Sequence, residues 1–268
     1  MTSATRNAAR PVKPRPSLLV PLGIVVFLLL TAASLSKQLG IGLDAAGLID
    51  DLGRGRPILE QLASPNWSYL PETIGPMIET FQMAVIASII GCGVALPVSF
   101  MASRVTTSGR VGLFVTRWVL NVVRAIPDVL YAMIFVAAVG IGPLPGIMAL
   151  ILFNIGVVAK LLSETVDGVD PGPIEAGRAS GANSFQTVRW GVLPQVLPHY
   201  VAYSLYTFEL NIRASTVLGI VGAGGIGRTL FAQYKLFHWS NVSVAIVELF
   251  VLVVAIEAIS IWLRRRLV

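Results

Sequence analysis

Two pairs of oppositely charged residues lie inside long apolar stretches of this sequence. Arg124 and Asp128 flank a proline, and Glu209 and Arg213 have the same spacing of four residues. An ionised side chain at the centre of a bilayer costs about 2.5–3.5 kcal/mol on insertion scales, so it needs a partner or a water-filled cavity. Because residues i and i+4 lie on one helix face, each pair can neutralise itself and stabilise a helix bundle.

The arginines of these pairs also suit a different chemistry, the binding of an oxyanion. A planar guanidinium can hold two oxygens of a phosphonate or phosphate group at once, and Ser215 and Thr216 add hydroxyl donors after Arg213. A partly neutralised arginine would lower the barrier for an anion without trapping it, as transport requires. We therefore predict a translocation path, with a purely structural role of both pairs as the alternative. The residues of the predicted path are Arg124, Asp128, Glu209, Arg213, Ser215 and Thr216.

No other arrangement in the sequence is typical of catalysis, metal binding or nucleotide binding. His199 and His238 have no metal-ligand spacing, and a P-loop is missing, so ATP and Mg²⁺ would have to bind partner chains. The stretch 222–227 fits G-x-G-x-x-G, but it follows an apolar stretch of membrane length instead of a β-strand. We expect its glycines to let the chain turn back or pack closely at a dimer interface. These glycines are Gly222, Gly224, Gly225 and Gly227, and Glu248 further along has no evident partner.

The composition is that of an all-α membrane protein. Of the 268 residues, 55% are hydrophobic and only 13% are charged, whereas about a quarter of the residues in soluble domains are charged. The formal net charge of +6 comes from basic residues at the ends of apolar stretches, so it does not indicate nucleic-acid binding. Pro127 interrupts one apolar stretch, and we expect a kink or two half-helices there. Six transmembrane helices are predicted, at residues 17–35, 76–101, 111–139, 144–166, 198–221 and 242–263.

Basic residues also predict the orientation of the chain in the membrane. The amino-terminal tail, the loop after the second span and the last residues are rich in Arg and Lys, which is typical of cytoplasmic segments. Both termini are therefore expected in the cytoplasm, together with the polar segment 167–197. The predicted organisation is a basic tail (1–16), a first transmembrane helix (17–35), an acidic external loop (36–75) and a membrane core (76–268).

The segment 167–197 is predicted to contain two short helices. Asp170, followed by prolines, is a helix-start signal, and Gly181 should end or bend this first helix. Asn183 or Ser184 can cap a second helix that runs to about Trp190, and Leu193, Pro194 and Pro198 are expected to close it. Such a bent pair suits a groove on another protein; an ordinary connector lying on the lipid headgroups is the alternative.

The spacing within this segment resembles the "EAA" coupling loop of ABC importer permeases. The matching positions are Glu175, Ala176, Gly181, Leu193 and Pro194, whereas Gly177 replaces an Ala and Gly191 an Ile of the family pattern. The resemblance implies that this segment contacts an ATPase. The coupling residues that it implies, together with the apolar anchor in the second helix, are Glu175, Ala176, Gly177, Gly181, Phe185, Leu193 and Pro194.

Further stretches, at 124–128, 140–143, 160–164, 211–219 and 222–227, resemble the phosphonate-type branch of these permeases. The resemblance implies a type I importer permease in the bacterial cytoplasmic membrane. It also implies a second copy of the permease, two cytoplasmic ATPase subunits and an external solute-binding protein as partners. The substrate would be a phosphonate, phosphite or phosphate. Methionine-type permeases have a similar glycine-rich end, so another small solute is the alternative, and an integral-membrane enzyme or scaffold is a third interpretation.

Overall fold

A computed structural model describes residues 19–36 and 45–267 of the chain. The chain divides into two units, residues 1–57 and 58–268, which are described separately. The first unit contains α1 (Leu19–Leu35), an apolar helix without buried residues that coincides with the predicted first span. It also contains most of α2 (Ala45–Leu62), a helix within the predicted external loop. The predicted tail 1–16 lies outside the described residues.

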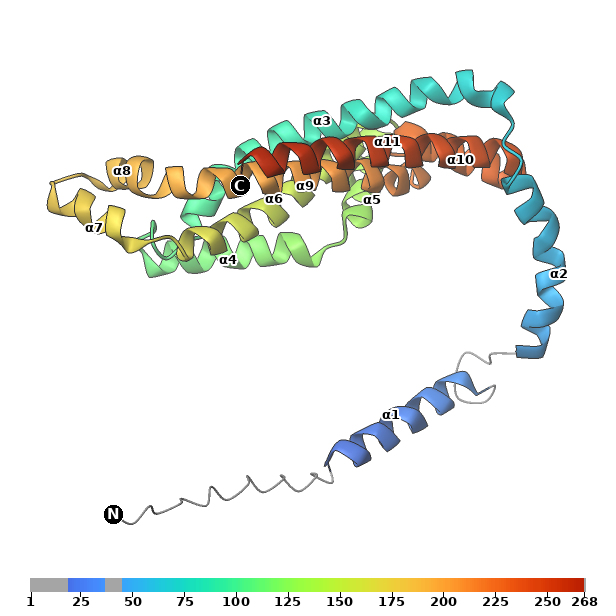
Figure 1. Ribbon diagram of the computed structural model, residues 1–268, viewed down its shortest axis with the longest axis horizontal. Helices are drawn as coiled ribbons and strands as arrows, with labels where there is room; N and C mark the ends of the chain where they lie inside the picture. The colour runs from blue at the N-terminus through green and yellow to red at the C-terminus, as the bar shows by residue number, and fades with distance from the viewer. Residues whose placement is uncertain (1–18, 37–44, 268) are drawn as a thin grey trace, which may run out of the picture. The chain divides into compact units, whose positions relative to one another are not determined.

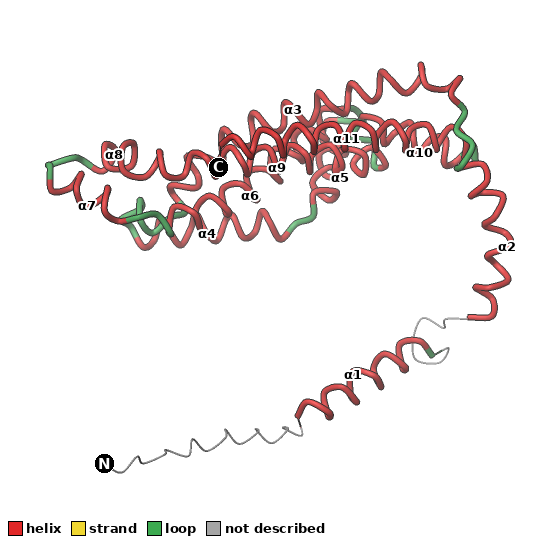
Figure 2. The backbone as a smooth tube through the Cα atoms, viewed as in Figure 1, coloured by secondary structure: helices red, strands yellow, loops and turns green. Residues whose placement is uncertain are grey.

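The second unit is a bundle of long helices, as Figures 1 and 2 show, and the described residues contain no strand. The predicted all-α fold is therefore confirmed. A short polar pair, α7 and α8, projects at one end of the bundle, and α10 leads towards the opposite end (Figure 1). The elements of this unit are η1 (Trp67–Tyr69), α3 (Leu70–Met101), α4 (Arg110–Ala125), α5 (Asp128–Val139), α6 (Pro143–Asp167), α7 (Pro171–Ala179), α8 (Ser184–Thr187), the π-helical turn η2 (Val188–Val192), α9 (Leu193–Ile220), α10 (Gly225–Lys235) and α11 (Trp239–Leu267).

Three helices, α3, α6 and α11, are long and apolar enough to cross a membrane, and two bent pairs raise this number to five in the described residues. The pairs are α4 with α5, and the run from α8 through α9 with α10. A bilayer core about 30 Å thick needs about 20 helical residues, and α1, with 17 residues, is a shorter apolar helix. Five of the six predicted spans thus each coincide with one helix, and the third, 111–139, falls on α4 and α5.

The third predicted span is broken at Pro127. Ile126 has an extended backbone, with φ −89° and ψ 123°, and α4 and α5 meet at an angle of 85°. Proline lacks an amide donor and disfavours helical geometry at the residue before it, so the chain leaves the helix at Ile126. The predicted kink is confirmed as two half-helices.

The centre of the bundle is formed by α3, α6 and α9, which are joined by buried amide side chains. Asn154 of α6 donates to the Ala87 carbonyl at 2.9 Å, and Asn211 of α9 donates to the Ser88 hydroxyl at 2.8 Å. Hydrogen bonds and small residues are the usual means of joining helices in lipid, where burial of apolar surface gives no advantage. Gly91 shows the close approach, because a Cβ at this position would lie 2.6 Å from the Asn154 Cβ.

Glycines place α10 directly beside the last turns of α9. Gly222, Gly224 and Gly225 all have positive φ, at 89°, 84° and 71°, and a Cβ on Gly227 would overlap the Thr216 carbonyl. These glycines pack closely within the chain, whereas the predicted close packing was at a dimer interface. The chain does not turn back here, because α10 continues at 43° to α9. Their role at a dimer interface stays a prediction.

Candidate functional site

The first short helix of the polar segment starts and packs as its sequence predicts. The Asp170 carboxylate accepts a hydrogen bond from Gly172 N at 2.9 Å, and Pro171 occupies the first turn, where an amide donor is not needed. Ile174 is the buried residue of α7. It packs into an apolar cluster with residues of α6, η2 and α9, namely Leu162, Val166, Val192 and Val196. A single side chain thus connects α7 to the interior of the bundle.

Gly181 ends α7 through a Schellman motif. The Gly181 amide donates to the Arg178 carbonyl at 3.0 Å, and the Ala182 amide donates to the Gly177 carbonyl at 3.0 Å. This motif requires a left-handed residue, and Gly181 has φ +80°. A Cβ at Gly181 would meet no atom within 4 Å, so backbone conformation alone favours glycine at this position.

The second short helix has a capping box, but it does not end where the sequence predicts. Asn183 Oδ1 accepts from Gln186 N, and Gln186 Oε1 accepts from Asn183 N, both at 2.9 Å. The π-helical turn η2 then joins α8 directly to α9. The prediction that Leu193 and Pro194 close this helix is wrong, because they occupy the first turn of α9, where a missing amide donor is tolerated.

Gln195 links the two ends of the polar segment. Its Oε1 accepts from Asp170 N at 3.0 Å, and its Nε2 donates to the Asp170 carbonyl at 3.3 Å and to the Gly191 carbonyl at 2.6 Å. Gly191 is buried against α7, because a Cβ there would lie 3.3 Å from the Pro173 carbonyl oxygen. The departure from the family pattern at Gly191 therefore coincides with a close contact. Sequence reasoning missed Gln195, since a glutamine in the first turn of a helix carries no distinctive signal.

Most of the predicted coupling residues lie on the surface of this segment. Glu175, Ala176, Gly181, Phe185 and Pro194 are exposed, whereas Gly177 and Leu193 are half-buried. Trp190 is also exposed and lies 5.3 Å from the Arg189 guanidinium. Exposed large apolar side chains on an otherwise polar segment are typical of a docking surface for another protein.

Asp167, at the junction between α6 and the polar segment, is a further site that sequence reasoning missed. Its Oδ1 accepts from the Ser103 hydroxyl and from Arg104 N, both at 2.7 Å. Its Oδ2 forms an ion pair with Arg117 at 2.7 Å, and Arg117 Nε donates to the Ala102 carbonyl at 2.8 Å. This carboxylate therefore joins the connector after α3 and the middle of α4 to the end of α6, shortly before α7 begins.

The predicted ion pair between Glu209 and Arg213 is confirmed. Arg213 donates to Glu209 Oε1, and Arg264 in the last turn of α11 lies 3.8 Å from Glu209 Oε2. The Glu209 side chain is 9% exposed, whereas the Arg213 side chain is 48% exposed. One buried carboxylate thus faces two arginines, and this three-residue cluster has a formal net charge of +1.

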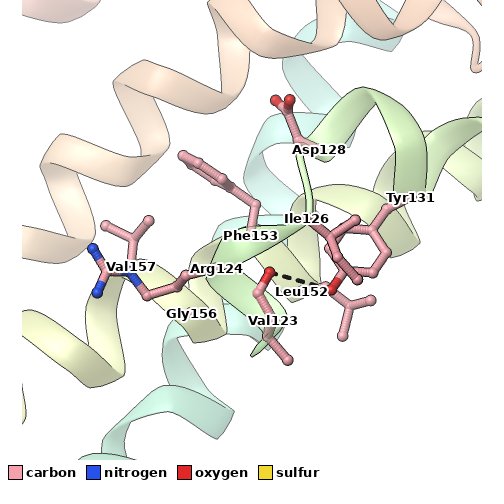
Figure 3. A pocket seen from close by; sticks show the side chains of 9 residues that line it. All are labelled: Val123, Arg124, Ile126, Asp128, Tyr131, Leu152, Phe153, Gly156 and Val157. Carbon is pink, nitrogen blue, oxygen red and sulfur yellow. Dashed lines mark hydrogen bonds between the residues drawn. The ribbon is translucent and has the colours of Figure 1, made fainter. Parts of the chain in front are cut away.

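The other predicted pair does not form. Pro127 breaks the helix between Arg124 and Asp128, so the two residues do not share a helix face, and that prediction is wrong. They line one cavity of about 190 Å³ between α6 and the break, together with Tyr131. Figure 3 shows the Arg124 guanidinium beside Val157 and the Asp128 carboxylate pointing elsewhere. Across the break, the Tyr131 hydroxyl donates to the Val123 carbonyl at 3.2 Å.

The two hydroxyls after Arg213 are bound to the backbone of their own helix. Ser215 is fully buried and donates to the Ile212 carbonyl at 2.9 Å, and Thr216 donates to the same carbonyl at 3.3 Å. The predicted path residues thus lie at two places. Glu209 and Arg213 form an ion pair in α9, and Arg124 and Asp128 line the cavity at the broken helix without pairing.

Comparisons with known proteins agree with this architecture. A family model described as "Binding-protein-dependent transport system inner membrane component" matches residues 95–268. The chain is 37% identical over 223 residues to the "Phosphite transport system permease protein PtxC" of Stutzerimonas stutzeri. That alignment covers 83% of this chain and 81% of the relative. It is 39% identical over 214 residues to the "Phosphate-import permease protein PhnE" of Mycolicibacterium smegmatis. That alignment covers 79% of this chain but only 40% of the relative.

A solved structure has the same fold. A chain of the MetNI methionine ABC transporter, in an inward-facing conformation, aligns with a TM-score of 0.65 at 23% identity. The alignment covers 73% of this chain and 96% of that chain. At this level of identity the likeness concerns the fold alone. Together, the relatives and the fold confirm the resemblance to phosphonate-type importer permeases.

Proposed function

Because this chain belongs to the family of inner membrane components of binding-protein-dependent transport systems, we propose that it is the permease subunit of an ATP-driven importer for a phosphorus oxyanion. In this proposal the chain forms a homodimer, which binds two cytoplasmic ATPase subunits and receives substrate from an external binding protein. The relatives named for phosphate and phosphite transport support the substrate class. ATP and Mg²⁺ would be bound by the ATPase subunits.

The observation that carries the proposal is the construction of the segment from Asp170 to Gln195. The side chains of Asp170 and Asn183 cap the two short helices, and Phe185 of α8 and Trp190 of η2 are exposed on this segment. Ile174 and Gln195 attach the segment to the bundle. A rigid, exposed pair of helices fits a groove on an ATPase, and its two attachments can carry a displacement into the bundle. Closure of the ATPases would then bias the bundle between two conformations that expose opposite sides of the membrane.

The cluster of Glu209, Arg213 and Arg264 supports an anionic substrate. Its net charge of +1 attracts an oxyanion, and the half-exposed Arg213 has donors that Glu209 does not use. Full neutralisation would remove this attraction, whereas two unpaired arginines would hold a dianion too tightly for release. Arg124, beside the cavity at the broken helix, is a second point on the proposed path.

The proposed orientation places both termini and the segment 167–197 in the cytoplasm. It follows from the basic residues at the ends of the chain, which include Arg264, Arg265 and Arg266 in the last turn of α11. The external binding protein would then meet the opposite end of the bundle, where α10 leads into α11.

Co-expression and reconstitution test this function. The tagged permease should co-purify with an ATPase, and its ATP hydrolysis in proteoliposomes should rise when a loaded binding protein is added. Uptake of radiolabelled phosphate, phosphite and methylphosphonate should exceed uptake of methionine. Transport of methionine alone, or purification of the permease without any ATPase, would contradict the proposal.

A further inference from the structure

A small cavity of about 80 Å³ lies between the connector after α3 and the two short helices of the polar segment. Part of its wall is apolar and includes Ile174 and Val192 of the cluster that joins α7 to the bundle. Its polar lining comes from the connector, from the last turn of α7 and from α8, and consists of Thr106, Ser108, Arg178, Ser184 and Thr187. Three separate elements therefore place one arginine and four hydroxyls around the same space.

Arg178 is the one charged residue among the described residues that line this cavity. Its side chain has no hydrogen bond or ion pair within the described parts of the chain, and Glu175, one turn earlier on α7, does not pair with it. A guanidinium is always charged and carries five N–H donors in a fixed plane. An anion in the cavity would therefore meet donors that no protein group uses.

Two of the four hydroxyls are already used as donors, and two are not. Thr106 and Thr187 both donate to backbone carbonyls, so they belong to the fixed wall of the cavity. The hydroxyls of Ser108 and Ser184 have no hydrogen-bond partner in the part of the chain that the structure describes. Together with Arg178, they offer donors from three elements to one ligand, as a tetrahedral oxyanion requires.

The surroundings of the cavity are positive overall, although they include carboxylates. Residues 102–117 and 167–197 contain five arginines and three acidic residues. Asp167 is paired with an arginine, and Asp170 caps α7. Neither of them, nor Glu175, lines the cavity. An anion would therefore meet no opposing charge from the lining residues.

The volume of the cavity restricts the size of the ligand. A water molecule needs about 10–15 Å³ of such space, so about 80 Å³ can hold one small polyatomic ion but not a nucleotide. A phosphate group has this size, and an arginine can bind two of its oxygens at once while hydroxyls donate to the others.

We infer that this cavity binds a single phosphate group between Arg178, Ser108 and Ser184. The inference goes beyond the proposed function and shares with it only the cytoplasmic placement of the polar segment. Inorganic phosphate and the headgroup of an anionic phospholipid both contain such a group and are both present on that side of a membrane. The bound group would connect the connector after α3 to the junction of α7 and α8. Its occupancy would then restrain movement of the polar segment relative to the bundle.

The first test measures binding of inorganic phosphate to the full-length permease in detergent without added lipid. Equilibrium dialysis with radiolabelled phosphate gives the Kd, with chloride keeping the ionic strength constant. Arg178→Gln should raise this Kd at least about tenfold, and Ser108→Ala several-fold, because hydrogen bonds to a charged group are the strong ones. In chloride alone, Arg178→Gln should melt at the wild-type temperature, since the exposed arginine has no partner to lose.

Two control variants separate this cavity from other basic sites. Arg189→Gln removes an arginine of the same polar segment whose guanidinium is 5.3 Å from the centroid of the Trp190 ring and which does not line the cavity. Arg213→Ala removes the arginine of the proposed path. Both variants should bind inorganic phosphate with the wild-type Kd.

A second arm identifies the source of the phosphate group. The permease is placed in nanodiscs of phosphatidylcholine, alone or mixed with phosphatidylglycerol. If the headgroup occupies the cavity, phosphatidylglycerol should raise the melting temperature of the wild type but not of Arg178→Gln, and inorganic phosphate should have no effect in detergent. If inorganic phosphate is the ligand, its effect should be the same in detergent and in both nanodiscs. Either pattern supports the inference.

Three results would overturn it. The first is that neither inorganic phosphate nor phosphatidylglycerol gives a response that depends on Arg178. The second is an equal loss of binding in Arg178→Gln and Arg189→Gln, which would indicate general attraction by basic residues. The third is a lower melting temperature of Arg178→Gln in chloride alone, which would assign the arginine a structural role. Failure of the proposed function is a separate result, because it is measured by ATPase co-purification and uptake.

Discussion

The side-chain amide of Gln195 lies against the backbone of Asp170, with Oε1 3.0 Å from Asp170 N and Nε2 3.3 Å from Asp170 O. The glutamine thus makes both hydrogen bonds that a neighbouring backbone would make. A third bond, to the Gly191 carbonyl at 2.6 Å, fixes the same amide to the turn before α9. The start of α7 is therefore attached to the first turn of α9 through one side chain.

Replacing Gln195 tests whether this attachment transmits movement. Gln195→Ala removes hydrogen bonds worth about 1 kcal/mol each and should loosen α7 without unfolding the bundle. We expect ATP hydrolysis to continue while uptake per ATP falls several-fold, measured in proteoliposomes. Gln186→Ala is the control, because Gln186 also bonds to the backbone but only within the cap of α8. An equal loss in both variants would show that general weakening of the segment is responsible.

A substitution series at Gly181 separates backbone conformation from surface contact. The site has φ +80° and open space around it, so Gly181→Asn should be nearly neutral and Gly181→Ala should weaken the cap of α7 by about 1 kcal/mol. Gly181→Trp should abolish uptake and ATPase association, because its side chain would project from the surface that we propose to dock on the ATPase. Membrane insertion should be normal in all three variants, as judged by the amount of monodisperse protein after extraction. Normal uptake by Gly181→Trp would remove the proposed coupling role.

Arg213→Ala tests the proposed path. It should lower uptake of phosphate and phosphite at least about tenfold, because in the proposed path the half-exposed guanidinium donates to the anion. The assembled complex should still hydrolyse ATP. Arg266→Ala is the control for loss of an arginine outside this cluster, since Arg266 lies in the last turn of α11 and its guanidinium is 4.2 Å from the centroid of the Trp262 ring. Normal uptake by Arg213→Ala would leave the pair with Glu209 as a structural feature.

Gly227→Ala tests the contact between α9 and α10. Its Cβ would overlap the Thr216 carbonyl, and backbone atoms cannot move aside as a flexible side chain can. We expect a loss of at least about 3 kcal/mol of stability, seen as a lower melting temperature and poor recovery from membranes. Gly93→Ala in α3 is the control, because a Cβ there meets no atom within 4 Å and alanine favours a helix. Equal melting temperatures for the two variants would contradict the close contact.

The sequence predicted the features that depend on local chemistry. The break at Pro127, the cap at Asp170, the end of α7 at Gly181 and the Glu209–Arg213 pair all follow from residues within four positions of one another. It also predicted the fold class and the family, since apolar stretches of membrane length and the spacing of the coupling motif are visible without any contacts.

The remaining features depend on residues that are distant in the sequence. The ties of Gln195 to Asp170 and of Asp167 to Arg117 join different elements, and nothing in their local sequence indicates the partner. The prediction of an Arg124–Asp128 pair failed because it applied helical spacing across a proline that ends the helix. The continuation of the second short helix into α9 was missed because a π-helical turn has no clear sequence signal.

The backbone contact at Gly227 has a consequence for how the two faces of the membrane communicate. With 28 residues and a rise of about 1.5 Å per residue, α9 is long enough to cross the bilayer by itself. Gln195 binds one end of α9, and the Gly227 backbone lies against Thr216 near the other end. We therefore expect the segment from Asp170 to Gln195 and the connector between α10 and α11 to shift together when α9 moves. A protein bound on the external side would then respond to whether the ATPase subunits have bound ATP.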